Sequence, residues 1–292
     1  MIEIRDLQLL NALARHRHFA KAAEECGISQ PAFSMRIRNL EDRLGVSIVR
    51  RANRFQGLTE EGEMIVQRAR RILDEAKALE QQVLASKGEI TGTLILGVIP
   101  TAIAFTGQLI KHLRQAHPRI VTRIETMSST AIQHRLDEGS LDAGITYGDS
   151  IGTDLRQVQP LYEETYVVLV PSHMADETGP IPWARVAEFP LSLLEPQMQN
   201  RRILDRIFSD QGLHPDIVAE TSGFTASMVM AREGLAATVV PSVLVHALGD
   251  LEGTKVLPLI EPVVSKPICM ATLARQPELP TVAALRAVVT SL

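Results

Sequence analysis

The sequence predicts an α/β protein with a small helical head, a long linker helix and a two-lobed α/β body. Three observations support this prediction: two amphipathic helical patterns meet at a sharp break near 27–31, an uninterrupted helical pattern follows over 59–87, and short β runs alternate with helices from 93 onward. A chain of 292 residues has room for about two domains. We expect a winged helix-turn-helix head over 1–58, a linker helix and hinge over 59–90, and a body over 91–292.

The break in the head joins two helices through a tight turn. Gly27 can take the left-handed conformation that ends a helix. Ser29 is a preferred N-cap, and Pro31 falls in the first helical turn, where its missing N–H is not needed. The helix before the break has one apolar face with small side chains that allow close packing, formed by Phe19, Ala22, Ala23 and Cys26.

The second helix has two different faces. Gln30, Ser34 and Arg38 recur at i, i+4 and i+8 and form a polar face. In a helix-turn-helix such a face enters the DNA major groove, where Gln pairs with adenine and Arg with guanine or phosphate. The alternative is an ordinary corner between two helices whose polar face is solvated. The opposite, apolar stripe should face the core of the head and consists of Phe33, Ile37, Leu40 and Leu44.

The stretch SIVRRANRFQGLTEEG, Ser47–Gly62, suits a two-stranded wing beside the second helix, with Arg51 and Arg54 near phosphates or the minor groove. The charge of the chain agrees with this interpretation. Residues 1–60 hold ten Lys and Arg against seven Asp and Glu, whereas the remainder holds 20 against 27. A weakly basic head on an acidic body indicates a polyanionic partner for the head.

The segment AAEECGISQPAFSMRIRNLEDRLGVSIVRR, followed by LTEEG, closely resembles the N-terminal domain of LysR-type transcriptional regulators. The resemblance extends along the whole chain and implies a bacterial regulator that binds promoter DNA. This chain departs from the family pattern at Met35, where members usually carry Arg, and at Val49 and Arg50, where many carry Phe and an acidic residue. The DNA contacts implied by the resemblance are Gln30, Pro31, Ser34, Arg38, Arg51 and Arg54.

The linker helix is expected from Thr59 to about Lys87, before a hinge at Gly88–Gly92. Its apolar residues alternate in steps of four and three, as in a coiled-coil seam. The seam could instead pack on the same protomer, but in the family the equivalent helix pairs with a second subunit. We therefore expect a homodimer, and through the body a homotetramer, with a dimerisation seam formed by Ile65, Ala69, Ile72, Ala76, Leu79 and Val83.

The alternation of strands and helices in the body indicates a parallel, doubly wound sheet. Its two lobes, at about 91–162 with 266–292 and about 163–265, resemble the effector domain of the family, which is similar to periplasmic solute-binding proteins. Expected helices lie near 102–117, 129–138, 200–212 and 224–233, and a last one begins at Pro280. Expected strands are Leu94–Val98, Ile120–Thr126, Ala143–Thr146, Tyr166–Val170, Leu191–Leu194, Ile217–Glu220, Ala237–Val240 and a return strand near 265–274.

Ligands of such folds bind beyond the carboxyl ends of the strands, between the lobes. Helix N-termini that follow these strands attract anions, so we expect a small anion or carboxylate as the effector. Hydroxyls at helix starts are also ordinary caps, which is the competing explanation for each of them. The expected effector-binding residues are Pro100, Thr101, Ser128, Ser129, Thr130, Thr146, Tyr147, Gln197, Gln199, Phe224 and Thr225.

Other classes of protein find less support in the sequence. We recognise no glycine-rich phosphate loop, nucleophile elbow or metal-ligand spacing, and therefore predict no catalytic residue, metal or cofactor. The remaining alternative is an α/β small-molecule-binding protein or enzyme whose helical head does not bind DNA. GVIPT at Gly97–Thr101 is reminiscent of the peroxide-sensing branch of the family, which needs a cysteine pair in the second lobe. Cys26 and Cys269 both lie outside that lobe, so we expect no thiol switch.

The sequence shows no signal region at its N-terminus and no apolar run of the roughly 18 residues that a membrane span needs. We therefore expect a cytoplasmic protein without membrane contact, for which RNA polymerase is a further candidate partner.

Overall fold

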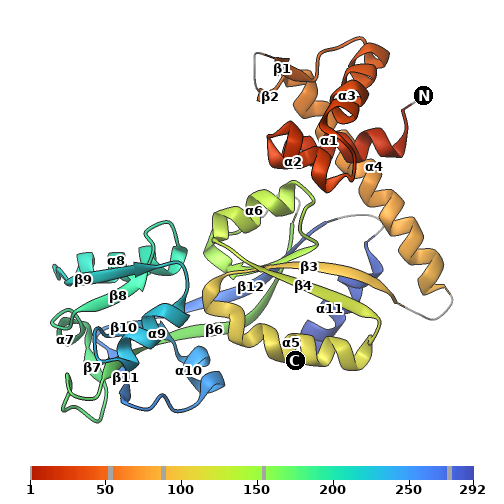
Figure 1. Cartoon of the computed structure of the whole chain (residues 1–292). Coiled ribbons are helices and arrows are strands. Elements are labelled where there is room, and N and C mark those ends of the chain that lie inside the picture. The colour runs from red at the N-terminus through yellow and green to blue at the C-terminus, as the bar shows by residue number, and fades with distance from the viewer. Residues whose placement is uncertain (1, 52–54, 87–89, 153–155, 275–277) are drawn as a thin grey trace. The chain divides into compact units, whose positions relative to one another are not determined.

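The structure is a computed structural model that describes residues 2–51, 55–86, 90–152, 156–274 and 278–292. It divides into two compact units, one formed by 1–88 with 277–280 and the other by 89–276 with 281–292 (Figure 1). Among the described residues, no helix has both the length and the apolar character to cross a membrane.

The head follows the predicted helix, turn and helix, with an additional first helix that the sequence patterns above do not include. Gly27 has φ +67°, and the Ser29 hydroxyl accepts a hydrogen bond from the Ala32 backbone N–H at 3.4 Å. The expected turn chemistry is thus confirmed. The elements of this unit are α1 (Ile4–His16), α2 (Phe19–Glu25), α3 (Gln30–Leu44), β1 (Val49–Arg51), β2 (Phe55–Leu58) and α4 (Glu60–Ala85).

The apolar stripe of α3 forms the centre of the head. Phe33, Ile37 and Leu40 are fully buried against α1 and α2. The Phe33 ring also meets the Phe19 ring edge to face, with 6.0 Å between the ring centroids. Because burial of such side chains is the main driving force for folding, this stripe fixes which side of α3 faces inward.

The linker helix α4 starts against the wing. The Thr59 hydroxyl accepts a hydrogen bond from the Gly62 backbone N–H at 2.9 Å and donates one to the Ser47 carbonyl at 2.6 Å. Glycine is required in this first turn, because a Cβ at position 62 would lie 2.2 Å from the Ile48 carbonyl oxygen. The expected two-stranded wing is present, with β1 and β2 antiparallel.

The first lobe of the body is built on three parallel strands in the order β4, β3, β5. The backbone connects them through helices, as the alternation in the sequence predicts. The elements are β3 (Gly92–Val98), a 3₁₀ turn η1 (Pro100–Ala102), α5 (Ile103–Ala116), β4 (Ile120–Thr126), α6 (Ser129–Asp137), β5 (Ala143–Tyr147), a second 3₁₀ turn η2 (Gly148–Ser150) and the C-terminal helix α11 (Pro280–Ser291).

The expected parallel order holds for β4, β3 and β5, whereas the return strand expected near 265–274 is antiparallel to its neighbours. Strand β12 (Ser265–Leu273) is antiparallel to β5 and to β6 (Arg156–Pro171), and β6 is antiparallel to two strands of the second lobe. The physical reason is that β6 and β12 carry the chain in opposite directions between the lobes, and both run from one lobe into the other (Figure 1). The sequence predicted only the apolar end of β6, because the first half of the strand is rich in polar residues and contains Pro160.

The second lobe contains strands and helices that the sequence predicted and others that it did not. β7, α7, α10 and β11 had no predicted counterpart, since each is very short or mixes polar and apolar residues. The elements are β7 (Ile181–Pro182), α7 (Trp183–Val186), β8 (Leu191–Leu194), α8 (Gln199–Asp210), β9 (Ile217–Thr221), α9 (Phe224–Arg232), β10 (Thr238–Pro241), α10 (Ser242–Leu248) and β11 (Thr254–Ile260).

Two glycine substitutions should change stability in opposite directions. Gly62→Ala forces a methyl group onto the Ile48 carbonyl and should destabilise the head by roughly 1–3 kcal/mol. Gly107→Ala, in the middle of α5 with open space around the added carbon, should stabilise the body by about 1 kcal/mol. Differential scanning calorimetry of both variants tests this, and a stabilising Gly62→Ala would contradict the packing at the start of α4.

Candidate nucleic-acid interface and effector site

The polar face of α3 is turned away from the core of the head. Gln30, Pro31 and Arg38 are exposed, and Ser34 is half-buried. The side chains of Gln30, Ser34 and Arg38 form no hydrogen bond or ion pair with any residue that the structure describes. Four of the six predicted DNA contacts therefore lie on one helix, with polar groups available to a partner.

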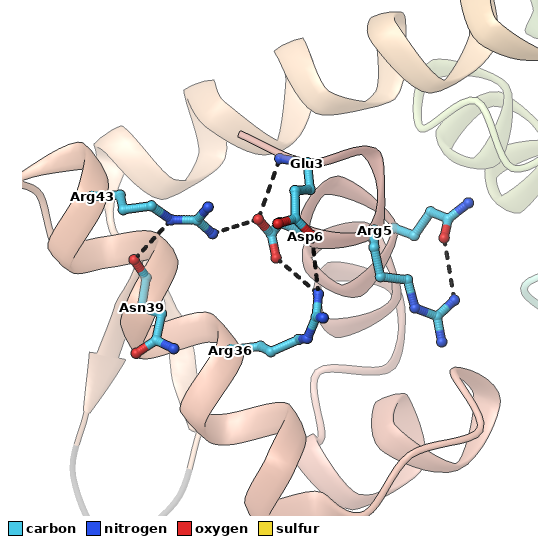
Figure 2. A network of polar contacts seen from close by, with 7 residues as sticks. Glu3, Arg5, Asp6, Arg36, Asn39 and Arg43 are labelled. Carbon is cyan, nitrogen blue, oxygen red and sulfur yellow. Dashed lines mark hydrogen bonds and ion pairs between the residues drawn. The ribbon is translucent and has the colours of Figure 1, made fainter. Parts of the chain in front are cut away.

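A buried carboxylate attaches the other flank of α3 to the N-terminus of α1 (Figure 2). Asp6 is only 3% exposed, and its two oxygens are shared between two arginines of α3. Arg36 Nη1 lies 3.4 Å from Asp6 Oδ1, Arg43 Nη2 bonds Asp6 Oδ2, and the Glu3 backbone N–H also points to Oδ2 at 3.4 Å. The Arg36 guanidinium is thus directed to α1 and away from the face that carries Gln30 and Arg38.

The wing carries the two remaining predicted DNA contacts. Arg51 is the last residue of β1, and its Cα is paired with that of Phe55 in the antiparallel ladder. Arg54 lies outside the described residues, as do Gly88 and Glu89 of the predicted hinge. The predicted contacts of Arg51 and Arg54 with DNA stay predictions.

In the first lobe, the predicted effector residues gather at the carboxyl ends of three neighbouring parallel strands. Thr101 follows β3, Ser129 follows β4, and Thr146 and Tyr147 end β5; all four are buried, as is Pro100. The hydroxyls of Thr101, Ser129 and Thr146 have no hydrogen-bond partner within the described part of the chain. Since an unpaired buried hydroxyl costs roughly 1–3 kcal/mol, these three groups call for a polar partner such as a ligand or water.

The other predicted residues behave differently. Ser128 is the N-cap of α6 and accepts a hydrogen bond from the Ala131 backbone N–H at 3.3 Å, as the capping alternative requires, while Thr130 is exposed. In the second lobe, Phe224 packs in an apolar cluster, and Thr225 and Gln197 are exposed. The Gln197 amide donates to the Glu195 carboxylate, and Gln199 starts α8 half-buried.

The sequence patterns missed Asn200, the second residue of α8. Its side chain is buried, yet both the oxygen and the nitrogen of its amide have no partner among the described residues. On β8, β9 and α9 of the same lobe, Ser227 links Ser192 and Thr221 through hydroxyl contacts of 2.9 Å. A polar residue beside the predicted Gln199, after a buried strand, was the signal available in the sequence.

A buried carboxyl group on β6 was also missed. Glu164 is 1% exposed, and the Tyr147 hydroxyl donates a hydrogen bond of 2.7 Å to its Oε1. Burial raises the pKa of Glu164 to about 7, an effect that the hydrogen bond from Tyr147 only partly offsets by favouring the ionised form. Burial likewise raises the pKa of Tyr147 well above its ordinary value.

No basic side chain of the described residues pairs with Glu164. Lys266 lies opposite Glu164 in the ladder of β6 and β12, but its Nζ is 3.3 Å from the Asp149 carboxylate. Because Glu164 adjoins the predicted residues Thr101 and Tyr147, an anionic ligand at this end of the site would meet a carboxylate unless Glu164 is protonated.

A winged helix-turn-helix unit on a two-lobed α/β unit with unpaired buried hydroxyls is the architecture of a ligand-responsive transcription regulator. Comparisons with known proteins specify the family. The profile described as bacterial regulatory helix-turn-helix protein, lysR family, matches 4–63, and the LysR substrate binding domain matches 87–292. The chain belongs to the LysR family and is a LysR-type transcriptional regulator.

Individual relatives agree with this assignment. The DNA-binding transcriptional dual regulator OxyR of Escherichia coli strain K12 is 30% identical over 263 residues, which cover 89% of this chain and 86% of the relative. A full-length OxyR variant from Pseudomonas aeruginosa has a TM-score of 0.76 at 26% identity, covering 100% of this chain and 94% of that one. Full-length CbnR in complex with its target DNA shares the fold, with a TM-score of 0.68 at 21% identity over 99% of each chain.

The buried carboxyl should make the stability of the body depend on pH. With a folded pKa of about 7 against an ordinary value of 4.5, Glu164 binds its proton more tightly in the folded state. The contribution of Glu164 to the free energy of unfolding is therefore fully present below pH 4.5 and is lost as pH rises through 7. Glu164→Gln should be about as stable as the parent at pH 5 and more stable by up to about 3 kcal/mol at pH 8.

Urea denaturation of the parent and the Glu164→Gln variant at both pH values measures this difference. Glu163→Gln is the matched control, because Glu163 neighbours Glu164 on β6 but has an exposed side chain. If Glu164→Gln changed the free energy of unfolding equally at pH 5 and pH 8, burial would not raise the pKa of this carboxyl group.

Proposed function

We propose that this LysR-type regulator binds promoter DNA in the cytoplasm through the exposed face of α3 and the wing. The single observation that supports this most is the polar face of Gln30, Ser34 and Arg38, which the protomer leaves without partners among the described residues. Pro31 begins the same face, and Arg51 and Arg54 would hold the phosphate backbone beside it. Gln30 is suited to an adenine edge, and Arg38 to guanine or phosphate.

The protein acts by binding and release, without catalysing a reaction. Within the described residues, no group of three or more His, Cys, Asp or Glu side chains is arranged to hold a metal ion. RNA polymerase at the promoter is the partner through which a DNA-bound regulator would change transcription. The relatives are regulators as well, which supports the same interpretation.

A small-molecule effector would bind at the carboxyl ends of β3, β4 and β5. The unpaired hydroxyls of Thr101, Ser129 and Thr146 supply hydrogen bonds there, with Pro100, Ser128, Thr130 and Tyr147 around them and Gln197, Gln199, Phe224 and Thr225 from the second lobe. The N-terminus of α6 favours a negative group near Ser129. At the Glu164 end, by contrast, an anion requires proton uptake, so anion affinity would fall as pH rises above about 7.

Relatives described as hydrogen peroxide-inducible genes activators do not imply a peroxide response for this chain. The chain has two cysteines, Cys26 in α2's C-terminal cap and Cys269 on β12, and both are free thiols. Burial raises the pKa of each thiol, which lowers its reactivity. The signal therefore enters as a bound ligand, which shifts the equilibrium between two arrangements by its unequal affinity for them.

The linker helix would join two protomers. Ile65 and Ala69, at the start of the predicted seam, pack within the head, and Ala76 is half-buried. In contrast, Ile72, Leu79 and Val83 expose large apolar side chains along the second half of α4. A second copy of α4 would cover them in a homodimer, and contacts between bodies would extend the assembly to a tetramer. Two linked heads would then bind two half-sites.

The assignment of DNA and effector contacts to separate units is tested by two alanine variants. Ser34→Ala should weaken specific DNA binding about fivefold per head, since it removes one hydrogen bond to DNA. Thr101→Ala should bind DNA as the parent does but lose its response to effector. Gel shifts with the region upstream of the protein's own gene, at two salt concentrations, measure both; binding should weaken steeply with salt because phosphate contacts release counterions. Equal loss of DNA binding in the two variants would refute this division.

A lysine in the exposed seam should break the dimer. Leu79 is 64% exposed in the protomer, so Leu79→Lys should leave the fold intact while placing a charge in the paired interface. Light scattering after size exclusion should give the mass of a monomer or a smaller assembly. Gln67→Lys, also exposed on α4 but on the side of the helix away from the seam, is the matched control, and an unchanged mass for Leu79→Lys would exclude pairing through this seam.

A further inference from the structure

Met35 is an apolar side chain at an unusual place in the head. It is 60% exposed on α3, whereas Phe33, Ile37 and Leu40 of that helix are fully buried and Leu44 is half-buried against the core of the head. Met35 therefore contributes little to the core. A single exposed apolar side chain is common by itself, so the position of Met35 on α3 decides what it could contact.

The position of Met35 on α3 places it within the face that we assign to DNA. At about 100° per residue, Met35 points almost directly away from the stripe of Phe33, Ile37 and Leu40. Pro31 lies one turn before it, and the exposed Arg38 lies one turn after it. The side chain thus stands between two predicted DNA contacts.

No neighbouring cation among the described residues takes over the place of Met35. Arg36 is the adjacent residue, but its guanidinium contacts Asp6 at 3.4 Å and Glu3 at 3.7 Å on the opposite flank of α3. At this position the helix presents a thioether and methyl group, with no charge and no strong hydrogen-bond donor. The group in the major groove that matches this chemistry is the 5-methyl group of thymine, which is read by apolar contact.

We propose that Met35 contacts the 5-methyl group of a thymine in each half-site, so that recognition of DNA by this chain depends on that methyl group. The inference rests on the proposed function, because it requires α3 to enter the major groove. Methionine suits such a contact, since its flexible and polarisable side chain adapts to the shape of its partner. The residue specifies one A·T base pair, while Gln30, Ser34 and Arg38 make the polar contacts around it.

The test uses the full-length protein and duplexes that it enriches from a randomised library. In the tightest duplex each thymine is replaced singly by deoxyuridine, which removes only the methyl group and keeps the base pair. We expect one position per half-site where the replacement raises Kd about fourfold for the parent protein, the value for burying one methyl group. Fluorescence anisotropy gives Kd for every combination of protein and duplex.

The variants separate this contact from a general effect of the substituted DNA. Met35→Ala should bind the thymine and deoxyuridine duplexes equally at that position. Met35→Arg should also lose the methyl dependence and should gain salt dependence, with a slope steeper by about 0.9 per head if the guanidinium reaches a phosphate. Met64→Ala is the matched control, since Met64 is 57% exposed in the same unit but lies on α4; it should keep the full effect of about fourfold.

Two results would overturn the inference while leaving the proposed function intact: specific binding that no deoxyuridine replacement weakens, or an equal loss for the parent and Met35→Ala at every sensitive position. A chain that enriches no duplex at all would instead refute DNA binding through α3, and the Met35 contact with it. Because Met35 is exposed, circular dichroism of the variants should match that of the parent in every case.

Discussion

The rotation of α3 about its own axis depends on one buried carboxylate. Apolar packing is not directional, so the stripe of Phe33, Ile37 and Leu40 alone would tolerate some rotation of the helix. Asp6 removes this freedom, because its two oxygens meet Arg36 and Arg43, which lie two turns apart on α3. Charge-assisted hydrogen bonds have a preferred geometry. The core stripe and the flank of Arg36 and Arg43 are thus held in place. The remaining face of α3, which carries Gln30, Ser34 and Arg38, is the one presented to a partner.

The buried polar groups of the body have different partners from the buried carboxylate of the head. In the head, the buried carboxylate of Asp6 has two arginines, each partly exposed. In the body, Glu164 has a tyrosine hydroxyl, and the hydroxyls of Thr101, Ser129 and Thr146 have no partner among the described residues. Such groups are tolerated where a ligand or water completes them. The buried charge of the head therefore holds two helices together, whereas the buried polar groups of the body are available to an incoming molecule.

The parts of the structure that the sequence predicted depend on local chemistry. Gly27 ends a helix, Ser29 and Thr59 begin helices, and each acts within a few residues of itself. The parts that it missed depend on partners far along the chain. Asp6 is separated by 30 residues from Arg36, and Tyr147 by 17 from Glu164. Because glutamate is rarely buried in proteins, the sequence provided no reason to place Glu164 inside the body.

The candidate effector site likewise contains residues that the sequence predicted and residues that it missed. Thr101, Ser129 and Thr146 were predicted because the carboxyl ends of parallel strands meet at one edge of a sheet, a rule that needs only strand order. Phe224, which stays a predicted effector contact, packs in the apolar core of its lobe, and an aromatic residue after a glycine gives no sign in the sequence of which side it faces. Asn200 was missed because its burial results from packing of the whole second lobe.

The linker helix joins the core of the head to the proposed dimer seam. Val66 and Ala69 of α4 are buried, whereas Leu79 and Val83 further along the same helix are exposed. One continuous helix of 26 residues, about 39 Å long, thus completes the core of the head and offers an apolar face beyond it. If two such helices pair, each head moves with its helix. Any shift of that pairing then changes the separation of the two α3 faces, which must match the half-site spacing of about 34 Å on DNA.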